Sequence, residues 1–519
     1  MKNLFLSVFL TGIAHIGFSQ NQFQFAYGGS GEELCNRLLI ANNRFNLAGH
    51  TTSYGSGSYD IFLLKTDTLG NLIQSGVYGS SGEDLAFSIA DAGNQNNFLC
   101  GYTTSFGSEQ PFVMKVDSSG QILFSAYYDL YGWAWDIASL PDGSAVITGN
   151  TGITDTDIFL LKIDSLGQVL WVKSYGDSLI NQGIKVISAS DNGFLIAGYT
   201  HIQAGGPLDF TVIKTDSLGN NLWMKRYGGS GWDMAYTIAE IGTDILVAGI
   251  SYTDVFNNNP NSADGLVLLL DATGAVKKSF VIGSSAFDQI RDLTVLPNGQ
   301  FTIVGSTNAV GNGQTDAFIM TLDTTGTILH QTLFGGSSFE QPLSVRSVSG
   351  NNNFIVAGYT ESYGGGMNDM YFLKTPAPDS NFCNQNTLNL SSAPCSVISD
   401  DVFTASVISC NYNTAAFSYL TPQISPYNIC PTTNTIDVVS ANDFLQIFPN
   451  PANDMLNIIS SKNRIEKVEI FSISGEKILE HIIKSNSITI PVNGISPGLY
   501  FMKINFGSEF SLRKIQIIR

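Results

Sequence analysis

The chain has 519 residues, a formal net charge of −18 and only 13% charged side chains, while glycine occurs 52 times. The negative charge excludes a nucleic-acid partner and electrostatic binding to anionic lipid, because both need a basic surface. Scarce charge with abundant glycine, phenylalanine and tyrosine is typical of a β-rich extracellular protein with many tight turns.

The first residues have the features of an export signal. Lys2 is followed by an apolar run from Leu4 to Ile16, and Gly17-Phe18-Ser19 forms a small-x-small cleavage site. We therefore expect residues 1–19 to be a secretory signal peptide. No later run approaches the roughly 18 apolar residues of a membrane-spanning helix, so we expect no transmembrane segment in the mature chain.

Seven copies of one unit follow, at intervals of 47 to 55 residues. Each copy has short segments in which apolar and polar residues alternate, as in half-buried strands. Four such strands per copy are typical of a β-propeller blade, and we predict a seven-bladed β-propeller over residues 20–376. The copies begin at Tyr27, Tyr78, Tyr128, Tyr175, Tyr227, Ile282 and Phe334.

Glycine positions support this prediction. A turn such as Asp67-Thr68-Leu69-Gly70 recurs between the third and fourth strands, with aspartate bonding the backbone and glycine closing the hairpin. A second glycine recurs in the second strand, where we expect it to let neighbouring sheets approach closely. The seventh copy lacks a fourth strand, and the segment Phe23–Tyr27 matches that strand, so we expect it to close the ring.

The repeat itself resembles a known one. Runs such as Tyr27-Gly28-Gly29-Ser30-Gly31, followed by an acidic residue, and the later Gly-Tyr-Thr and Asp-x-Phe-x-x-Lys-x-Asp-x-x-Gly patterns are similar to the bacterial SBBP-type β-propeller repeat. The resemblance covers about Phe23 to Lys374. It implies a secreted or surface propeller without one common activity.

Two columns of the repeat are candidates for binding. An acidic column at the start of the first strand (Glu33, Asp84, Asn181, Asp233, Asp288 and Glu340) recurs so regularly that we interpret it as bonding its own turn. The next positions vary between copies and combine charges with aromatic rings, which suits sugar binding, although channel lining and packing explain them equally well. The candidate ligand-binding residues are Arg37, Phe87, Trp135, Asp136, Lys185, Tyr236, Arg291 and Asp292.

Catalytic signatures are missing from the sequence. The histidines are few and solitary, and no GxSxG, HExxH, phosphate-binding loop or EF-hand loop occurs. Paired aspartates such as Asp60 and Asp67 lie roughly 23 Å apart on an extended strand, too far for a glycosidase pair. We predict no catalytic residues, no metal ligands and no cofactor, with calcium as an open alternative.

A cysteine-containing segment follows over residues 377–440. Its four cysteines (Cys383, Cys395, Cys410 and Cys430) suggest two disulfides in an exported protein, and all three pairings stay open. We expect a linker or a small β segment here.

Residues 441–519 are predicted to form a small immunoglobulin-like β-sandwich, because short alternating strands are separated by Asn-Pro, Ser-Gly and Pro-Gly turns. Motif residues recur here in a fixed order: Pro449, Asn450, Pro451, Ala452, Gly475, Gly498 and Tyr500. With these residues the segment closely resembles the type A sorting domain of the type IX secretion system. The resemblance implies the secretion machinery as a partner, export to the outer surface or the medium, and removal of the domain.

The fold class is therefore all-β, and the favoured function is binding of an extracellular glycan or protein, as in adhesion or capture. Two alternatives stay open at this point: a polysaccharide hydrolase or lyase with its site on the propeller face, and a structural matrix component.

Overall fold

The computed structural model describes residues 22–518 apart from 154, 253–261, 312, 349–352, 376–384, 387, 402–403, 430–444, 451, 462–463, 473–476 and 507–509. The predicted signal peptide, residues 1–19, lies outside this part. Every regular element described is a β-strand, so the chain is all-β as predicted. No helix able to cross a membrane is found among the described residues. The chain divides into two compact units, Met1–Cys430 and Pro431–Arg519.

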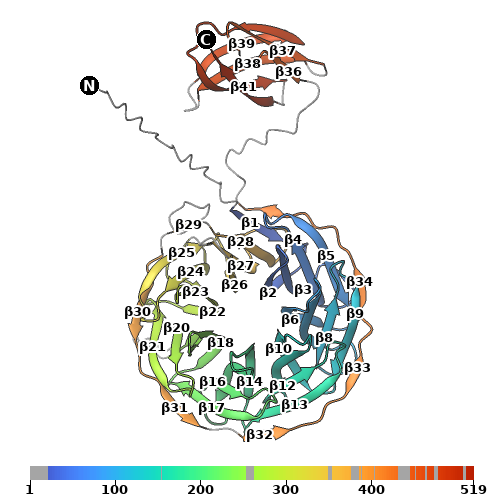
Figure 1. Cartoon of the computed structure of the whole chain (residues 1–519), viewed down its shortest axis with the longest axis vertical. Helices are drawn as coiled ribbons and strands as arrows, with labels where there is room; N and C mark the ends of the chain where they lie inside the picture. The colour runs from blue at the N-terminus through green and yellow to red at the C-terminus, as the bar shows by residue number, and fades with distance from the viewer. Residues whose placement is uncertain are drawn as a thin grey trace, which may run out of the picture. The chain divides into compact units, whose positions relative to one another are not determined.

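The described part of the first unit contains seven five-stranded antiparallel sheets in a propeller-like ring (Figure 1). The inner strands are β2 (Glu33–Ala41), β6 (Asp84–Asp91), β10 (Gly132–Ser139), β14 (Asn181–Ser188), β18 (Asp233–Ile241), β22 (Asp288–Val295) and β26 (Glu340–Ser347). The second strands are β3 (Arg44–Thr51), β7 (Asn97–Thr103), β11 (Ala145–Thr151), β15 (Phe194–His201), β19 (Asp244–Ser251), β23 (Phe301–Thr307) and β27 (Phe354–Thr360).

The outer half of each sheet completes the repeat. The third strands are β4 (Asp60–Thr66), β8 (Gln110–Val116), β12 (Asp157–Ile163), β16 (Leu208–Thr215), β20 (Asp264–Leu270), β24 (Asp316–Leu322) and β28 (Asp369–Lys374). The fourth strands are β5 (Leu72–Gly79), β9 (Ile122–Tyr128), β13 (Val169–Gly176), β17 (Asn221–Gly228), β21 (Val276–Gly283), β25 (Ile328–Phe334) and, from the N-terminus, β1 (Phe23–Tyr27).

The N-terminal strand joins the last sheet. β1 pairs antiparallel with β28, with Phe23 opposite Lys374 and Tyr27 opposite Met370. The predicted pairing of this segment with the seventh copy is therefore confirmed. Residues about 350 positions apart thus lie in one sheet, which ties the two ends of the repeat array together.

The sequence predicts a separate segment over residues 377–440, but the first compact unit extends to Cys430. Residues 385–429, here called the belt, add one outer strand to every sheet and run round the ring in the reverse order of the repeats (Figure 1). Its strands are β29 (Gln385–Asn386), β30 (Ser391–Pro394), β31 (Ile398–Asp401), β32 (Thr404–Val407), β33 (Tyr412–Thr414), β34 (Ser418–Leu420) and β35 (Tyr427–Asn428). The belt covers strand edges that would otherwise carry unpaired backbone groups.

The belt also overturns part of the disulfide prediction. Cys395 and Cys410 are free thiols. Cys395 follows β30 and packs against an apolar cluster that includes β19 and β20, whereas Cys410 precedes β33 and packs against another cluster that includes β8 and β11. The wrapping of the belt thus carries the two thiols to different sheets. Cys383 and Cys430 lie outside the described residues.

The two recurrent glycines behave differently. Gly70 has a φ of 82°, and Asp67 accepts hydrogen bonds from the backbone of Leu69 at 2.8 Å and Asn71 at 2.9 Å, so the predicted turn is confirmed. In the second strand, a Cβ on Gly49 would lie 1.7 Å from the carbonyl oxygen of Leu34. The close approach is therefore to the inner strand of the same sheet, and the expectation that neighbouring sheets approach there is wrong.

The second unit consists of two antiparallel sheets that share one apolar core. The three-stranded sheet contains β36 (Leu445–Phe448), β37 (Met455–Ser460) and β40 (Ser487–Pro491). The four-stranded sheet contains β38 (Ile465–Ser472), β39 (Lys477–Ser485), β41 (Gly498–Asn505) and β42 (Phe510–Ile517).

Candidate functional site

A β-bulge in each inner strand separates two columns of side chains. In β2 the register shifts between Cys35 and Arg37, and the other six inner strands shift at the equivalent place. A bulge re-aims the side chains on either side of it. The bulged residues are partly exposed: Asn36, Phe87, Trp135, Ile184, Tyr236, Arg291 and Leu343. The residues after the bulge are Arg37, Ser88, Asp136, Lys185, Thr237, Asp292 and Ser344.

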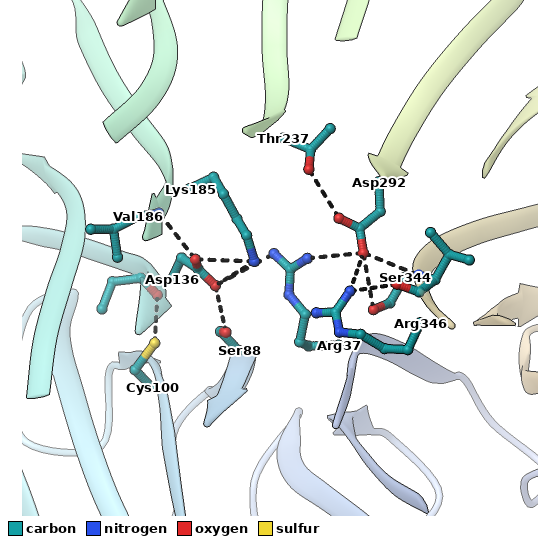
Figure 2. A network of polar contacts seen from close by, with 12 residues as sticks. Arg37, Ser88, Cys100, Asp136, Lys185, Val186, Thr237, Asp292, Ser344 and Arg346 are labelled. Carbon is teal, nitrogen blue, oxygen red and sulfur yellow. Dashed lines mark hydrogen bonds and ion pairs between the residues drawn. The ribbon is translucent and has the colours of Figure 1, made fainter. Parts of the chain in front are cut away.

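The second column meets on the axis of the ring (Figure 2). The Arg37 guanidinium lies 3.5 Å from the carboxylate of Asp136 and 3.6 Å from that of Asp292. Lys185 pairs with Asp136 at 3.3 Å, and Arg346 pairs with Asp292 at 2.8 Å. These five side chains form the axial network.

Hydroxyl and backbone groups complete the axial network. Ser88 donates to Asp136 at 2.6 Å, while Thr237 and Ser344 donate to Asp292 at 3.0 Å and 3.2 Å. Every inner strand thus contributes at least one member, and β26 contributes two, Ser344 and Arg346. The sheet of Arg37 neighbours neither the sheet of Asp136 nor that of Asp292, so its ion pairs cross the middle of the ring. The centre of the ring is therefore occupied by protein at this level.

Burial and pairing shift the ionisation of the axial network. Burial, together with the nearby Arg37 guanidinium, lowers the pKa of Lys185 to about 8. Burial alone would raise the pKa of Asp292, but Arg346, Arg37 and Lys185 outweigh it and hold that pKa below its usual range. Burial opposes the charge on Arg37, yet Asp136 and Asp292 outweigh it, so its pKa is raised. The charges are thus held by one another.

Four of the eight candidate ligand-binding residues belong to this network. Arg37, Asp136, Lys185 and Asp292 are brought together as one group, but their charged atoms face one another rather than solvent. Sequence reasoning missed Arg346. It lies two residues after Ser344, and the alternation of an extended strand was the signal that could have found it.

The other candidate residues remain partly exposed. Phe87 stacks on Trp135 with ring centroids 4.4 Å apart. Beside them Tyr102 stacks on Trp133 at 5.1 Å, and the two tryptophans meet edge to face at 5.3 Å. These four rings, here called the aromatic cluster, come from β6, β7 and β10. Sequence reasoning missed Tyr102 and Trp133, although both belong to regular columns of the repeat.

Polar partners fix the edges of the aromatic cluster. The Trp133 indole donates to Glu109 at 2.9 Å, and the Tyr102 hydroxyl donates to Glu83 at 3.0 Å. The Trp135 indole donates to Asn150 at 3.1 Å. Because the four rings pack on one another and three of them are also held by a hydrogen bond, the cluster is preorganised.

A second group lies on sheets farther round the ring. The Arg291 guanidinium lies 4.4 Å from the centre of the Tyr236 ring, a cation–π contact between the sheets of β22 and β18. Arg291 and Tyr236 are thus brought together, and apart from the axial network.

The repeated acidic column has an internal role, as interpreted from the sequence. Glu33 is buried and accepts hydrogen bonds from the backbone of Gly29 at 2.6 Å and Ser53 at 3.2 Å. Asp84 accepts from the backbone of Ser80 at 2.7 Å and the hydroxyl of Ser105 at 2.8 Å. These carboxylates hold their own turns.

Among the described residues, no group of three or more histidine, cysteine and acidic side chains could hold a metal ion. Burial lowers the pKa of His50 to about 4, so its imidazole is neutral at physiological pH. Asn36 lies 3.3 Å from its Nδ1 and donates to the carbonyl of Ala86 at 2.8 Å, which makes this a packed structural contact.

The predicted sorting residues gather at the end of the second unit. The Asn450 side chain accepts from the backbone of Gln516 at 2.8 Å, and Ala452 exchanges backbone bonds with Gln516 and Ile518. The Tyr500 hydroxyl donates to the carbonyl of Ser496 at 2.8 Å, beside the start of β41 at Gly498. Pro449 directly precedes Asn450, while Pro451 and Gly475 lie outside the described residues.

Residues 446–518 match the family described as "Secretion system C-terminal sorting domain". The protein is a secreted or cell-surface protein. The match marks it as cargo of the type IX secretion system, so the secretion machinery is a partner, as the resemblance implied.

Other likenesses of the chain are weaker. The chain is 26% identical over 251 residues to the regulatory protein FlaEY of Caulobacter vibrioides, covering 44% of this chain and 26% of that protein. It is 21% identical to the uncharacterized WD repeat-containing protein L264 of Acanthamoeba polyphaga mimivirus, covering 40% of this chain and 20% of that protein. The crystal structure of Sqt1 from Chaetomium thermophilum aligns with 9% identity and a TM-score of 0.41, covering 69% of this chain and 98% of that one. The chain thus spans about a quarter or less of the two curated relatives.

Proposed function

We propose that the chain is an exported seven-bladed β-propeller of the SBBP repeat type that captures an extracellular glycan with the aromatic cluster. In this proposal residues 1–19 are a signal peptide, and the second unit is an immunoglobulin-like sorting domain that is removed after export. The single observation that carries the proposal is the aromatic cluster itself: four partly exposed or edge-anchored rings beside a ring centre filled by the axial network.

The chemistry of the aromatic cluster supports a sugar. Aromatic faces pack against the C–H faces of sugar rings, and polar groups at their edges fix hydroxyls. Trp133 and Trp135 provide the faces, and Glu83 and Glu109 provide acceptors beside them. Since the rings are already stacked and hydrogen bonded, little side-chain entropy is lost when a ligand binds.

Glycan arrays probed with the secreted protein, with and without calcium, test this proposal. We expect selective binding that falls about tenfold or more in Trp135→Ala and Trp133→Ala. Trp223→Phe, on the outer strand β17, is the matched control and should bind as wild type does. Product release from the bound glycan would instead favour a hydrolase or lyase. If the protein binds no glycan on the array, the proposal is opposed, and a protein partner or a matrix role is favoured.

A further inference from the structure

Tyrosine hydroxyls fasten neighbouring sheets at five junctions of the ring. Each tyrosine is the last or the last but one residue of a fourth strand and donates to the carbonyl of the turn glycine in the next sheet. Tyr78 reaches Gly120 at 2.8 Å and Tyr227 reaches Gly274 at 2.7 Å. The other pairs are Tyr27 with Gly70, Tyr128 with Gly167 and Tyr175 with Gly219.

The junction between the sheets of β21 and β24 lacks this fastening, because Ile282 stands in the tyrosine position. Four residues earlier, Trp223 lies over the turn glycine Gly274 at the preceding junction, whereas Lys278 stands in that position here. Two large aromatic side chains are thus replaced by an isoleucine and a lysine.

The belt leaves space at the same junction. In the sheet of β5, Tyr419 of the belt is opposite Tyr78 and stacks on it, with centroids 5.0 Å apart. In the sheet of β21, the belt residue opposite Ile282 is Ser392. The belt thus supplies no ring at this junction, and the ring that lies against the turn glycine Gly326 is that of Phe280.

A cavity of about 700 Å³ opens there. Its walls come from β21, from the turn before β25 and from the belt, and include Lys277, Lys278, Phe280, Thr325, Ser392 and Cys395. The volume lies within the range of about 300–1,000 Å³ that is usual for small-molecule sites.

The lining of the cavity has one sign of charge. It contains two lysines and several hydroxyl groups but no carboxylate, in a chain whose net charge is −18. Lys277 pairs with Asp244 at 2.5 Å, and Asp244 does not line the cavity. The hydrogen bond from Thr325 and the charge of Lys278 lower the pKa of Asp323, which likewise lies outside the lining.

The Thr325 hydroxyl donates to Asp323 and the Ser279 hydroxyl donates to the carbonyl of Cys395. The cavity therefore offers ammonium groups as donors and these hydroxyl oxygens as acceptors.

We propose that this cavity binds an acidic saccharide, a short oligosaccharide whose carboxylate or sulfate group pairs with Lys278 while its hydroxyls meet Ser392 and Thr325. The inference deepens the proposed capture of glycan and rests on it for the choice of a saccharide. It assigns a second site, separate in the fold from the aromatic cluster, and commits it to anionic units. The Phe280 ring supplies an apolar wall for the sugar ring.

Calorimetric titration of the full secreted chain tests the inference with three probes: digalacturonic acid, a sulfated heparin disaccharide and neutral cellobiose. We expect at least one acidic probe to bind about tenfold or more tightly than cellobiose. Lys278→Gln should weaken that binding about tenfold, and Lys225→Gln, on the outer strand of the neighbouring sheet, should leave it unchanged. Binding of only one acidic probe would say whether carboxylate or sulfate is the preferred group.

A variant that fills the cavity gives a more direct test of the inference. Ile282 does not itself line the cavity, but a tyrosine side chain there should donate to the carbonyl of Gly326 in its wall. Ile282→Tyr should therefore weaken binding of the acidic probe while the thermal midpoint rises. If that variant does not fold, Ser392→Tyr fills the cavity from the belt. Wild-type affinity in a folded, filled variant would overturn the inference, as would the failure of both acidic probes to bind.

A substitution in the aromatic cluster distinguishes the cavity assignment from the proposed function. Trp135→Ala should leave binding of the acidic probe at the cavity unchanged. If Trp135→Ala loses that binding and Lys278→Gln keeps it, the acidic sugar binds at the aromatic cluster, and the cavity assignment fails while the proposed function stands.

Discussion

The Tyr128 hydroxyl donates a hydrogen bond to the carbonyl oxygen of Gly167, 2.9 Å away in the next sheet, and both partners are buried. The bond joins residues 39 positions apart and fastens one sheet to its neighbour. It shows how stability in this ring depends on junctions as well as on each sheet.

Tyr128→Phe should therefore lower the free energy of unfolding by about 1–2 kcal/mol, since it leaves a buried carbonyl without its donor. Urea denaturation of the purified protein measures the loss. Tyr427→Phe, at an exposed tyrosine of the belt, is the control and should change stability by less than about 0.5 kcal/mol. Equal effects of the two substitutions would contradict a fastening role.

Asp292→Asn should destabilise the protein by about 3–5 kcal/mol, because the buried Arg37 and the partly buried Arg346 would lose their charged partner. The thermal midpoint and the unfolding free energy report the loss. Asp244→Asn removes a more exposed ion pair with Lys277 and should cost less than about 1 kcal/mol. A small loss in Asp292→Asn would mean that the axial network contributes little to stability.

The free energy of unfolding should depend on pH through the ionisation of Asp60. Burial, and secondarily the facing Asp84 carboxylate, raise the pKa of Asp60 from 3.8 to about 6. The folded state thus binds this proton more tightly than the unfolded state. Its contribution to stability is fully present below about pH 4 and is lost as the pH rises through 6.

Asp60→Asn removes that titration. The variant should gain on the order of 1 kcal/mol over wild type at pH 7, and the gain should vanish near pH 4. Unfolding curves between pH 4 and 7 measure it. Asp67→Asn is a control with the opposite expected pH dependence. Hydrogen bonds from Asn71 and Leu69 outweigh burial and lower the pKa of Asp67. Its substitution should therefore lower the free energy of unfolding more at neutral pH than in acid. A gain for Asp60→Asn that is independent of pH would exclude this explanation.

Replacing the belt, residues 385–429, by a glycine–serine linker should open the outer edges of all seven sheets. Open edges pair with other chains, so we expect oligomers and faster proteolysis. Size-exclusion chromatography with light scattering measures the mass. A monomer with an unchanged thermal midpoint would show that the belt does not protect the edges.

Deleting residues 446–518 should retain the protein inside the cell, because this segment matches the sorting domain. Immunoblots of cells and medium measure the distribution. Ile482→Ser, at a side chain that is 75% exposed in that domain, should be exported normally. Export of the truncated chain would show that the signal lies elsewhere.

The repeat pattern was enough to predict the strands, the hairpin turns and the pairing of Phe23–Tyr27 with the last copy. Each of these depends on local alternation or on turn chemistry that is written within a few residues. The sorting domain could be predicted for the same reason, because its motif residues follow one another in order along one short segment.

The site was less predictable. Arg37 and Asp292 were candidates for binding a ligand, but the bulge in each inner strand turns them toward one another across the ring. A bulge depends on the contact between two strands, here made possible by a glycine in the second strand, so one strand read alone does not reveal it.

The sequence by itself determined the all-β class, the repeat unit and the export address, because strand alternation, turn residues and a linear motif act over short distances. Only the tertiary structure decided that the belt encircles the ring, that the axial charges pair internally and that Lys278 and Ser392 line a cavity between two sheets. Those outcomes depend on contacts between residues tens to hundreds of positions apart, which become neighbours only when the sheets pack beside one another in the folded chain.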